Sequence, residues 1–173
     1  MGSKIVTFVL GSREVEVMVK PMTTLQAVLR YQLGYTAVKE GCRQGGCGSC
    51  TVLVEGEPML ACLLPVEDVA GKQVSTLESI TPADGLDPLQ QAFLDASGFQ
   101  CGYCTPGMIM VSKALLEHNP RPSREEIVDA LAGNLCRCTG YEPIIAAVEG
   151  AAQAGAVQAG AGQAGAAPGA QRR

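Results

Sequence analysis

Two ordered sets of four cysteines constrain this 173-residue chain more than any other feature. The first set has the spacing C-x4-C-x2-C-x11-C and consists of Cys42, Cys47, Cys50 and Cys62. The second set is a C-x2-C pair followed, after 31 intervening residues, by a C-x-C pair; its members are Cys101, Cys104, Cys136 and Cys138. Four thiolates complete the ligand sphere of a structural zinc ion or of a [2Fe–2S] cluster, so the spacing predicts metal centres.

The first set has the spacing of plant-type [2Fe–2S] ferredoxins, which is C-x4-C-x2-C followed by a distant cysteine. Three of its thiolates converge from one glycine-rich loop, residues 41–50. We expect Cys62 on the returning strand of a following hairpin, where it faces that loop. The loop glycines permit positive φ angles and expose backbone N–H groups that hydrogen-bond cluster sulfur atoms.

The second set is less specific, because its spacing also suits a structural zinc ion. We expect each pair at a point where one helix gives way to the next, so that the four thiolates meet on the axis of a helical bundle. Three alternatives stay open at this point. The cysteines pack as small hydrophobes, both sets bind zinc, or C-x2-C is a redox dithiol, although residues 100–107 lack the usual βαβ setting.

Residues 1–80 have the pattern of a small α+β domain. Alternating apolar residues predict a β-hairpin near the start of the chain. A Thr23-x-x-Gln26 capping box predicts a helix that ends at Gly34. The predicted strands cover residues 5–10, 15–19, 51–54, 59–64 and 73–76. This order of elements predicts a sheet wrapped around one helix.

Residues 81–150 have the pattern of four helices joined by short loops, which implies a bundle. The predicted helix starts are Asp87-Pro88, Thr105-Pro106, a capping box over 123–126, and Pro143. Residues 81–85 are typical of a linker between the two domains. Residues 151–173 consist mostly of Ala, Gly and Gln, and we expect a disordered tail there.

Charge and hydropathy exclude several functions. The net charge of −4 argues against nucleic-acid binding, which needs clustered positive charge. No stretch approaches the roughly 18–20 apolar residues of a membrane helix, and the N-terminal apolar run is too short for a signal peptide. We therefore expect a soluble cytoplasmic protein, whose cysteines serve as metal ligands rather than as disulfides.

Three segments resemble signatures of the molybdenum hydroxylases, a family that includes xanthine dehydrogenases, aldehyde oxidoreductases, aerobic carbon monoxide dehydrogenases and hydroxybenzoyl-CoA reductase. Residues 41–52, GCRQGGCGSCTV, look like the family's ferredoxin loop. Residues 100–107, QCGYCTPG, and 133–141, GNLCRCTGY, look like its helical-domain signatures. The three segments occur in the family's order, and the chain is similar to the separate small iron–sulfur subunit of the multi-subunit bacterial enzymes.

The resemblance implies a β-grasp ferredoxin domain over 1–80 and a four-helix-bundle [2Fe–2S] domain over 81–150. It also implies two [2Fe–2S] clusters on the eight cysteines. The substrate would react at a molybdenum cofactor in a large subunit, so no catalytic residue is expected on this chain. Electrons would pass through the helical-domain cluster and then the ferredoxin-domain cluster to FAD in a medium subunit, in a dimer of three-subunit units. In hydroxybenzoyl-CoA reductase the net flow is reversed.

Two cofactor contacts are implied by position in the family's motifs. Gln100 would contact the molybdenum cofactor of the neighbouring subunit, and Cys138 would lie nearest the pterin amino group as well as binding its cluster. The alternative for Gln100 is a polar side chain that caps a loop. Arg43 and Arg137 adjoin cluster ligands and either offset the cluster charge or are simply solvated. His118, the only histidine, is expected to have a structural role at a helix C-terminus.

Two other functions remain as alternatives to the electron-transfer subunit. They are a free-standing two-cluster ferredoxin and a zinc-stabilised interaction module. The substrate is chosen in another subunit, so carbon monoxide, an aldehyde, a purine or other N-heterocycle, and an aromatic thioester all stay open. The physiological electron acceptor also stays open, and the cluster potentials do not follow from sequence.

Overall fold

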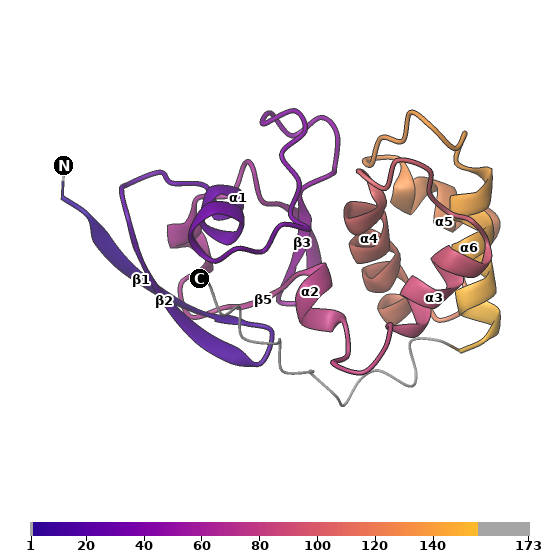
Figure 1. Cartoon of the computed structure of the whole chain (residues 1–173), viewed down its shortest axis with the longest axis horizontal. Coiled ribbons are helices and arrows are strands. Elements are labelled where there is room, and N and C mark those ends of the chain that lie inside the picture. Colours follow the sequence, from indigo (N-terminus) through magenta and orange to yellow (C-terminus); the bar gives the residue numbers. More distant parts are fainter. Residues whose placement is uncertain (1, 156–173) are drawn as a thin grey trace.

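The first two strands form an antiparallel hairpin (Figure 1). In the computed structural model, which describes residues 2–155, these strands are β1 (Lys4–Leu10) and β2 (Arg13–Val19). Side chains at every second position of β1 are buried, namely Val6, Phe8 and Leu10. The period of two places them on one face of the sheet, as the alternation predicts.

The sheet has five strands in the order β2-β1-β5-β3-β4. The other strands are β3 (Thr51–Val54), β4 (Glu57–Leu60) and β5 (Gln73–Ser75). β5 runs parallel to β1, whereas the other neighbouring pairs are antiparallel. One helical segment packs its buried face on this core: α1 (Leu25–Ala27), which continues as the π-helix η1 (Val28–Gln32). A 3-10 helix, η2 (Val66–Val69), was not predicted.

The start of the first helix differs from the prediction by one residue. Thr24, not Thr23, is the N-cap, and its hydroxyl accepts a hydrogen bond from the N–H of Ala27 at 3.2 Å. The Thr23 hydroxyl instead donates to the carbonyl of Lys20. Gln26 is buried and donates to the carbonyl of Lys39 at 2.6 Å, so it takes no part in a capping box. Two adjacent threonines offer the same cap chemistry, and tertiary contacts decide which of them is used.

Four longer helices pack together at the other end of the molecule, and a short helix, α2, leads into them (Figure 1). The elements are α2 (Leu77–Ile80), α3 (Pro88–Asp95), α4 (Thr105–His118), α5 (Arg124–Leu131) and α6 (Glu142–Gln153). Their shared core includes Leu89, Phe93, Met108, Leu116, Ile127 and Ile144. α3 packs against α6, and α5 lies against both α4 and α6.

Two of the predicted helix starts are confirmed as capping boxes. Asp87 caps α3 through Leu89 and Gln90, and Ser123 caps α5 through Glu126. The start at Thr105 is wrong by one residue, since Cys104 is the N-cap and Thr105 is the first helical residue of α4. Within the described residues the Thr105 hydroxyl is buried and has no hydrogen-bond partner.

The last helix extends further than the sequence predicts. α6 continues to Gln153, and Ala151 is buried in the helical core, so the tail does not begin at residue 151. Alanine supports helix formation, and the packed face of α6 outweighs the single glycine at position 150. The remaining part of the predicted tail, residues 156–173, lies outside the described residues.

The sheet and the helices share a small apolar contact. Leu53 of β3 packs against Met110 and Ala114 of α4, with Leu77 and Ile80 of α2 beside them. This contact sets α4 against β3, so the loops at the ends of these elements are held at a fixed separation. Within residues 2–155 no helix is long and apolar enough to span a membrane.

Candidate metal centres

The first set of cysteines comes together around the loop that precedes β3. Cys50 and Cys62 are buried and adjacent to each other, while Cys42 and Cys47 form a second, more exposed pair. Cys62 is not on the returning strand, because β4 ends at Leu60 and Cys62 lies in the turn that follows. The pairing of Thr51 with Leu60 nevertheless places this turn beside Cys50.

Backbone N–H groups of the loop point at sulfur. The N–H of Gly46 donates to Cys42 Sγ at 3.2 Å, and that of Gln44 lies 3.5 Å from the same atom. The pKa of Cys42 is lowered to about 7, mainly by the N–H of Gln44 and by the Cys47 side chain, with a smaller effect from the N–H of Gly46. Burial acts in the opposite sense on Cys50 and raises its pKa to about 12. Metal binding displaces these thiol protons, and the loop already provides donors for the thiolate that results.

The loop is closely packed at Gly41, where there is no space for a side chain. A Cβ at Gly41 would lie 2.8 Å from Cys47 Sγ and equally close to the hydroxyl of Ser49. The Ser49 hydroxyl itself lies 3.2 Å from Cys47 Sγ. A thiolate on iron has no proton, so in the loaded protein this hydroxyl must be the donor.

The cysteines of the second set come from two loops between helices. Cys101 and Cys104 precede and begin α4, and Cys136 and Cys138 lie between α5 and α6. The sulfur atoms of Cys101 and Cys138 are 3.6 Å apart, and both residues are exposed. Cys104 is buried and adjoins Cys136. The set therefore has one outer pair and one inner pair.

The cysteines of the second set differ in the direction in which their surroundings shift the thiol pKa. Burial raises the pKa of Cys104 to about 12. Burial also opposes ionisation of Cys136, but hydrogen bonds from the Thr139 hydroxyl, 3.1 Å away, and from backbone N–H groups lower its pKa overall. The hydrogen bond shared with Cys101 raises the pKa of Cys138.

Tyr141 shapes the second loop, although the sequence reasoning gave it no role. Its hydroxyl accepts a hydrogen bond from the N–H of Cys136 at 2.9 Å and donates to the carbonyl of Asn134 at 3.2 Å. Its φ of +69° is unusual for a residue other than glycine. The hydroxyl residues Ser49 and Thr139 were missed in the same way. The sequence did contain a clue to these roles, because Ser49, Thr139 and Tyr141 all lie within the cysteine-containing segments 41–52 and 133–141.

The other candidate residues lie at the surface. Gln100 is exposed beside the exposed Cys101. Arg43 forms an ion pair with Glu40 and has a φ of +56°, whereas Arg137 is simply exposed. His118 is the last residue of α4, and its Nε2 lies 3.2 Å from Glu57.

Each set offers its thiols as two pairs. In a [2Fe–2S] cluster each iron takes two protein ligands. The residues present therefore fit one [2Fe–2S] cluster per set, with N–H and O–H donors already beside Cys42, Cys47 and Cys136.

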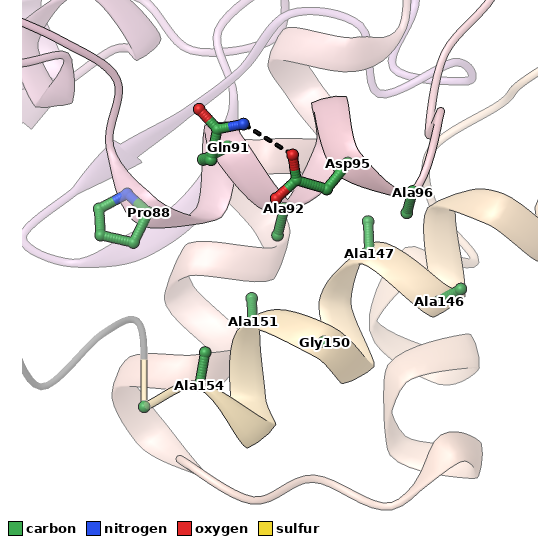
Figure 2. A pocket seen from close by; sticks show the side chains of 11 residues that line it. Pro88, Gln91, Ala92, Asp95, Ala96, Ala146, Ala147, Gly150, Ala151 and Ala154 are labelled. Atoms are coloured by element: carbon green, nitrogen blue, oxygen red, sulfur yellow. Dashed lines mark hydrogen bonds between the residues drawn. The ribbon is translucent and has the colours of Figure 1, made fainter.

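A groove of about 590 Å³ between α3 and α6 lies apart from these loops (Figure 2). It is lined mainly by small residues, among them Ala92, Ala147 and Ala151. Its polar side chains are already paired, because Gln91 donates to Asp95 at 2.7 Å. The groove is lined by no cysteine and is not part of either centre.

Comparison with known protein families identifies both halves of the chain. Residues 4–100 match the model of a 2Fe-2S iron-sulfur cluster binding domain. Residues 76–149 match the model of a second family, described as a [2Fe-2S] binding domain. The first cysteine set falls within the first match alone. All four cysteines of the second set fall within the second match alone.

Individual relatives share the same two halves. The nicotinate dehydrogenase small FeS subunit of Eubacterium barkeri is 48% identical over 132 residues, which cover 76% of this chain and 84% of that subunit. Aldehyde oxidase 1 of Oryctolagus cuniculus is 44% identical over 81% of this chain, but the match spans only 11% of that protein. A chain in the crystal structure of quinoline 2-oxidoreductase from Pseudomonas putida 86 superimposes with a TM-score of 0.84 at 39% identity, covering 91% of this chain and 100% of that one.

Proposed function

Because the chain belongs to the iron–sulfur small subunits of the molybdenum hydroxylase family, we propose that it relays electrons between a molybdenum-cofactor subunit and an FAD subunit. The arrangement of eight free thiols as two sets of paired ligands carries this proposal. The domain containing the first set would be a β-grasp ferredoxin domain, residues 1–80. The domain containing the second set would be a four-helix-bundle [2Fe–2S] domain, residues 81–150.

The chain's own residues hold and tune the two centres. When bound, each [2Fe–2S] cluster supplies a reversible one-electron couple, whose potential depends on hydrogen bonds to sulfur, charge and burial. The Gly46 N–H and the Ser49 hydroxyl stabilise negative charge on the first set. The Thr139 hydroxyl does the same for the second set. The burial of Cys50 and Cys104 keeps water from the inner half of each centre.

An apolar surface surrounds the outer pair of the second set and suits a protein partner. Phe99, Tyr103 and Leu135 are exposed large side chains, and each lies within two residues of a cysteine in this set. Exposed apolar groups concentrated beside a redox centre are expected where another subunit covers them. We propose that the large molybdenum-cofactor subunit docks here, with Gln100 and Cys138 against the cofactor.

The first set would then face the FAD subunit. Its outer pair, Cys42 and Cys47, is less buried than Cys50 and Cys62. The assembly would be a dimer of heterotrimers. All eight cysteines are free in the structure, which agrees with a reducing compartment, and we place the complex in the cytoplasm.

Anaerobic purification of the tagged chain from its native cells tests this proposal. We expect it to retain a large subunit that carries molybdenum and a medium subunit that carries FAD, identified by mass spectrometry and metal analysis. A stable monomer with both clusters and no such partners would instead identify a free-standing ferredoxin. A colourless chain that contains zinc would identify an interaction module without redox function.

A further inference from the structure

The backbone of Tyr141 donates a hydrogen bond to the hydroxyl group that faces the second set. Its N–H lies 3.1 Å from Thr139 Oγ1, and that oxygen lies 3.1 Å from Cys136 Sγ. An oxygen that accepts from an N–H keeps its own hydrogen for another acceptor. A thiolate on iron has no hydrogen, so the Thr139 hydroxyl then donates to sulfur. The three groups form a directed series of hydrogen bonds that ends at Cys136 Sγ.

The side chain of Tyr141 holds the loop in which this series lies. Its hydroxyl accepts from the N–H of Cys136 at 2.9 Å and donates to the carbonyl of Asn134 at 3.2 Å. Its ring packs against the helical core. The carbonyl of Tyr141 accepts from the N–H of Ile145 at 2.9 Å, in the first turn of α6. One residue thus fixes both ends of loop 134–141 against the start of a helix.

The conformation of Tyr141 indicates that its side chain matters at this position. Tyr141 is the N-cap of α6 and has a φ of +69°, in the left-handed region that glycine adopts without strain. A side chain other than that of glycine makes this conformation costly, and surrounding contacts must compensate for the cost. The packed ring and the two hydrogen bonds of the hydroxyl are such contacts. They hold the N–H of Tyr141 where it reaches Thr139.

The Thr139 hydroxyl is the kind of donor that needs such support. Backbone N–H groups of Cys138 and Thr139 also face Cys136 Sγ, and their directions are fixed by the course of the chain. A hydroxyl instead rotates about its C–O bond and turns its hydrogen toward any suitable acceptor. The N–H of Tyr141 occupies one side of this oxygen and leaves the hydrogen directed at sulfur. Hydrogen bonds in series also polarise and strengthen one another.

We infer that Tyr141 is a positioning residue of the second centre, which orients the Thr139 hydroxyl toward Cys136 Sγ and holds the loop that carries both. This role rests on the proposed function, since it presumes a [2Fe–2S] cluster at this set. A donor directed at a ligand sulfur stabilises the added negative charge of the reduced state and raises the potential. Tyr141 acts through Thr139, so its influence on the potential requires the Thr139 hydroxyl.

Variants of the full-length chain, purified anaerobically with its clusters, test this role. Tyr141→Phe keeps the ring and the backbone N–H and removes only the hydroxyl. Thr139→Val removes the oriented hydroxyl, whereas Thr139→Ser retains it. Tyr31→Phe is the matched control, because the Tyr31 hydroxyl also donates a hydrogen bond, to Glu40 Oε2 at 2.6 Å, but lies in the domain of the first set.

Three quantities should be measured: iron per chain, the reduction potential of each cluster, and the coupling of exchangeable deuterons to the reduced second cluster by electron–nuclear double resonance in D2O. We expect full iron in every variant. Tyr141→Phe should lower the second potential and weaken the hydroxyl deuteron coupling, and Thr139→Val should lower that potential and abolish the coupling. Thr139→Ser and Tyr31→Phe should resemble the wild type. Tyr141→Phe combined with Thr139→Val should shift the potential no further than Thr139→Val alone, because both act through one hydroxyl.

Four outcomes would overturn the role of Tyr141. Full iron with an unchanged second potential in Tyr141→Phe is the first. A shift that persists undiminished in the presence of Thr139→Val is the second, because Tyr141 would then act independently of that hydroxyl. A raised potential would show that Tyr141 instead withholds the N–H of Cys136 from the centre. Loss of second-set iron from Tyr141→Phe would show that the hydroxyl only keeps the loop in shape. A wild-type chain that binds no iron would refute the proposed function instead.

Discussion

The sulfur atoms of Cys101 and Cys138 lie 3.6 Å apart, although 37 residues separate them in the sequence. Both are exposed, whereas Cys104, their partner in the second set, is buried. The outer face of this centre is therefore the side that a neighbouring protein can approach. Gln100 is exposed directly beside it.

Gln100→Ala should impair turnover of the assembled complex more than it impairs folding. The side chain is exposed in the isolated chain, so its loss should cost little folding stability. Turnover and the thermal midpoint should be compared with those of Gln91→Ala, an exposed glutamine on α3 that faces the groove between α3 and α6. Unchanged turnover in Gln100→Ala would count against its contact with the cofactor.

Ser49→Ala should lower the reduction potential of the first cluster only. Its hydroxyl, 3.2 Å from Cys47 Sγ, stabilises the additional negative charge of the reduced state. One hydrogen bond worth about 1 kcal/mol corresponds to about 40 mV for a one-electron couple. Thr139→Val is the reciprocal variant and should lower the potential of the second cluster. Redox titration checks both, and a shift of both potentials in either variant would show that the hydroxyls do not act locally.

Thiol reactivity in the iron-free chain should rank Cys42 first and Cys50 and Cys104 last. At neutral pH a pKa near 7 leaves much of Cys42 as the reactive thiolate, whereas pKa values near 12 keep the buried thiols protonated. Alkylation of Cys42 should therefore level off above about pH 7, while that of Cys104 rises up to about pH 12. Peptide mapping after brief iodoacetamide treatment measures the order, and denaturing urea should abolish it. Equal rates in the absence of urea would show that the loops require iron to form.

Asp87→Ala should destabilise the chain more than Ser123→Ala, although both remove a capping box. Ser123 is an exposed cap, so we expect a loss of about 1 kcal/mol. Asp87 also lies 3.5 Å from the Nζ of buried Lys113, and removing it leaves that charge with Glu117, at 3.6 Å, as its one acidic neighbour among residues 2–155. The combined loss should reach about 2–4 kcal/mol. Anaerobic urea unfolding followed by circular dichroism measures both, and equal midpoints would show that Lys113 does not depend on Asp87.

Local sequence patterns predicted the start of a helix well where a single capping residue determines that start. The Asp87-Pro88 and Ser123 helix starts were confirmed, because cap and first turn lie within four residues of each other. The patterns failed where tertiary contacts choose between equivalent neighbours, as with Thr23 and Thr24. The end of α6 was missed because packing on the helical core stabilises an Ala-rich segment that composition alone does not.

The two groups of cysteines could be recognised from their spacing, but the residues that support their loops could not. Tyr141 acts through its contact with Cys136. Asn134 acts through its contact with Gly48, which lies 86 positions away in the sequence. No periodicity or spacing in one sequence reports such a contact. The sequence also gave no indication that Gly48 and Gly107 face the same buried asparagine.

The central claim is that each set of four cysteines holds one [2Fe–2S] cluster. Iron, acid-labile sulfide and zinc should be counted per chain in the same anaerobically purified native sample. We predict about four iron and four sulfide with no stoichiometric zinc, which is two clusters on eight cysteines. About two iron and two sulfide would mean that one set holds no cluster. Two zinc ions without sulfide would contradict the account outright and leave a structural module with four thiolates per metal.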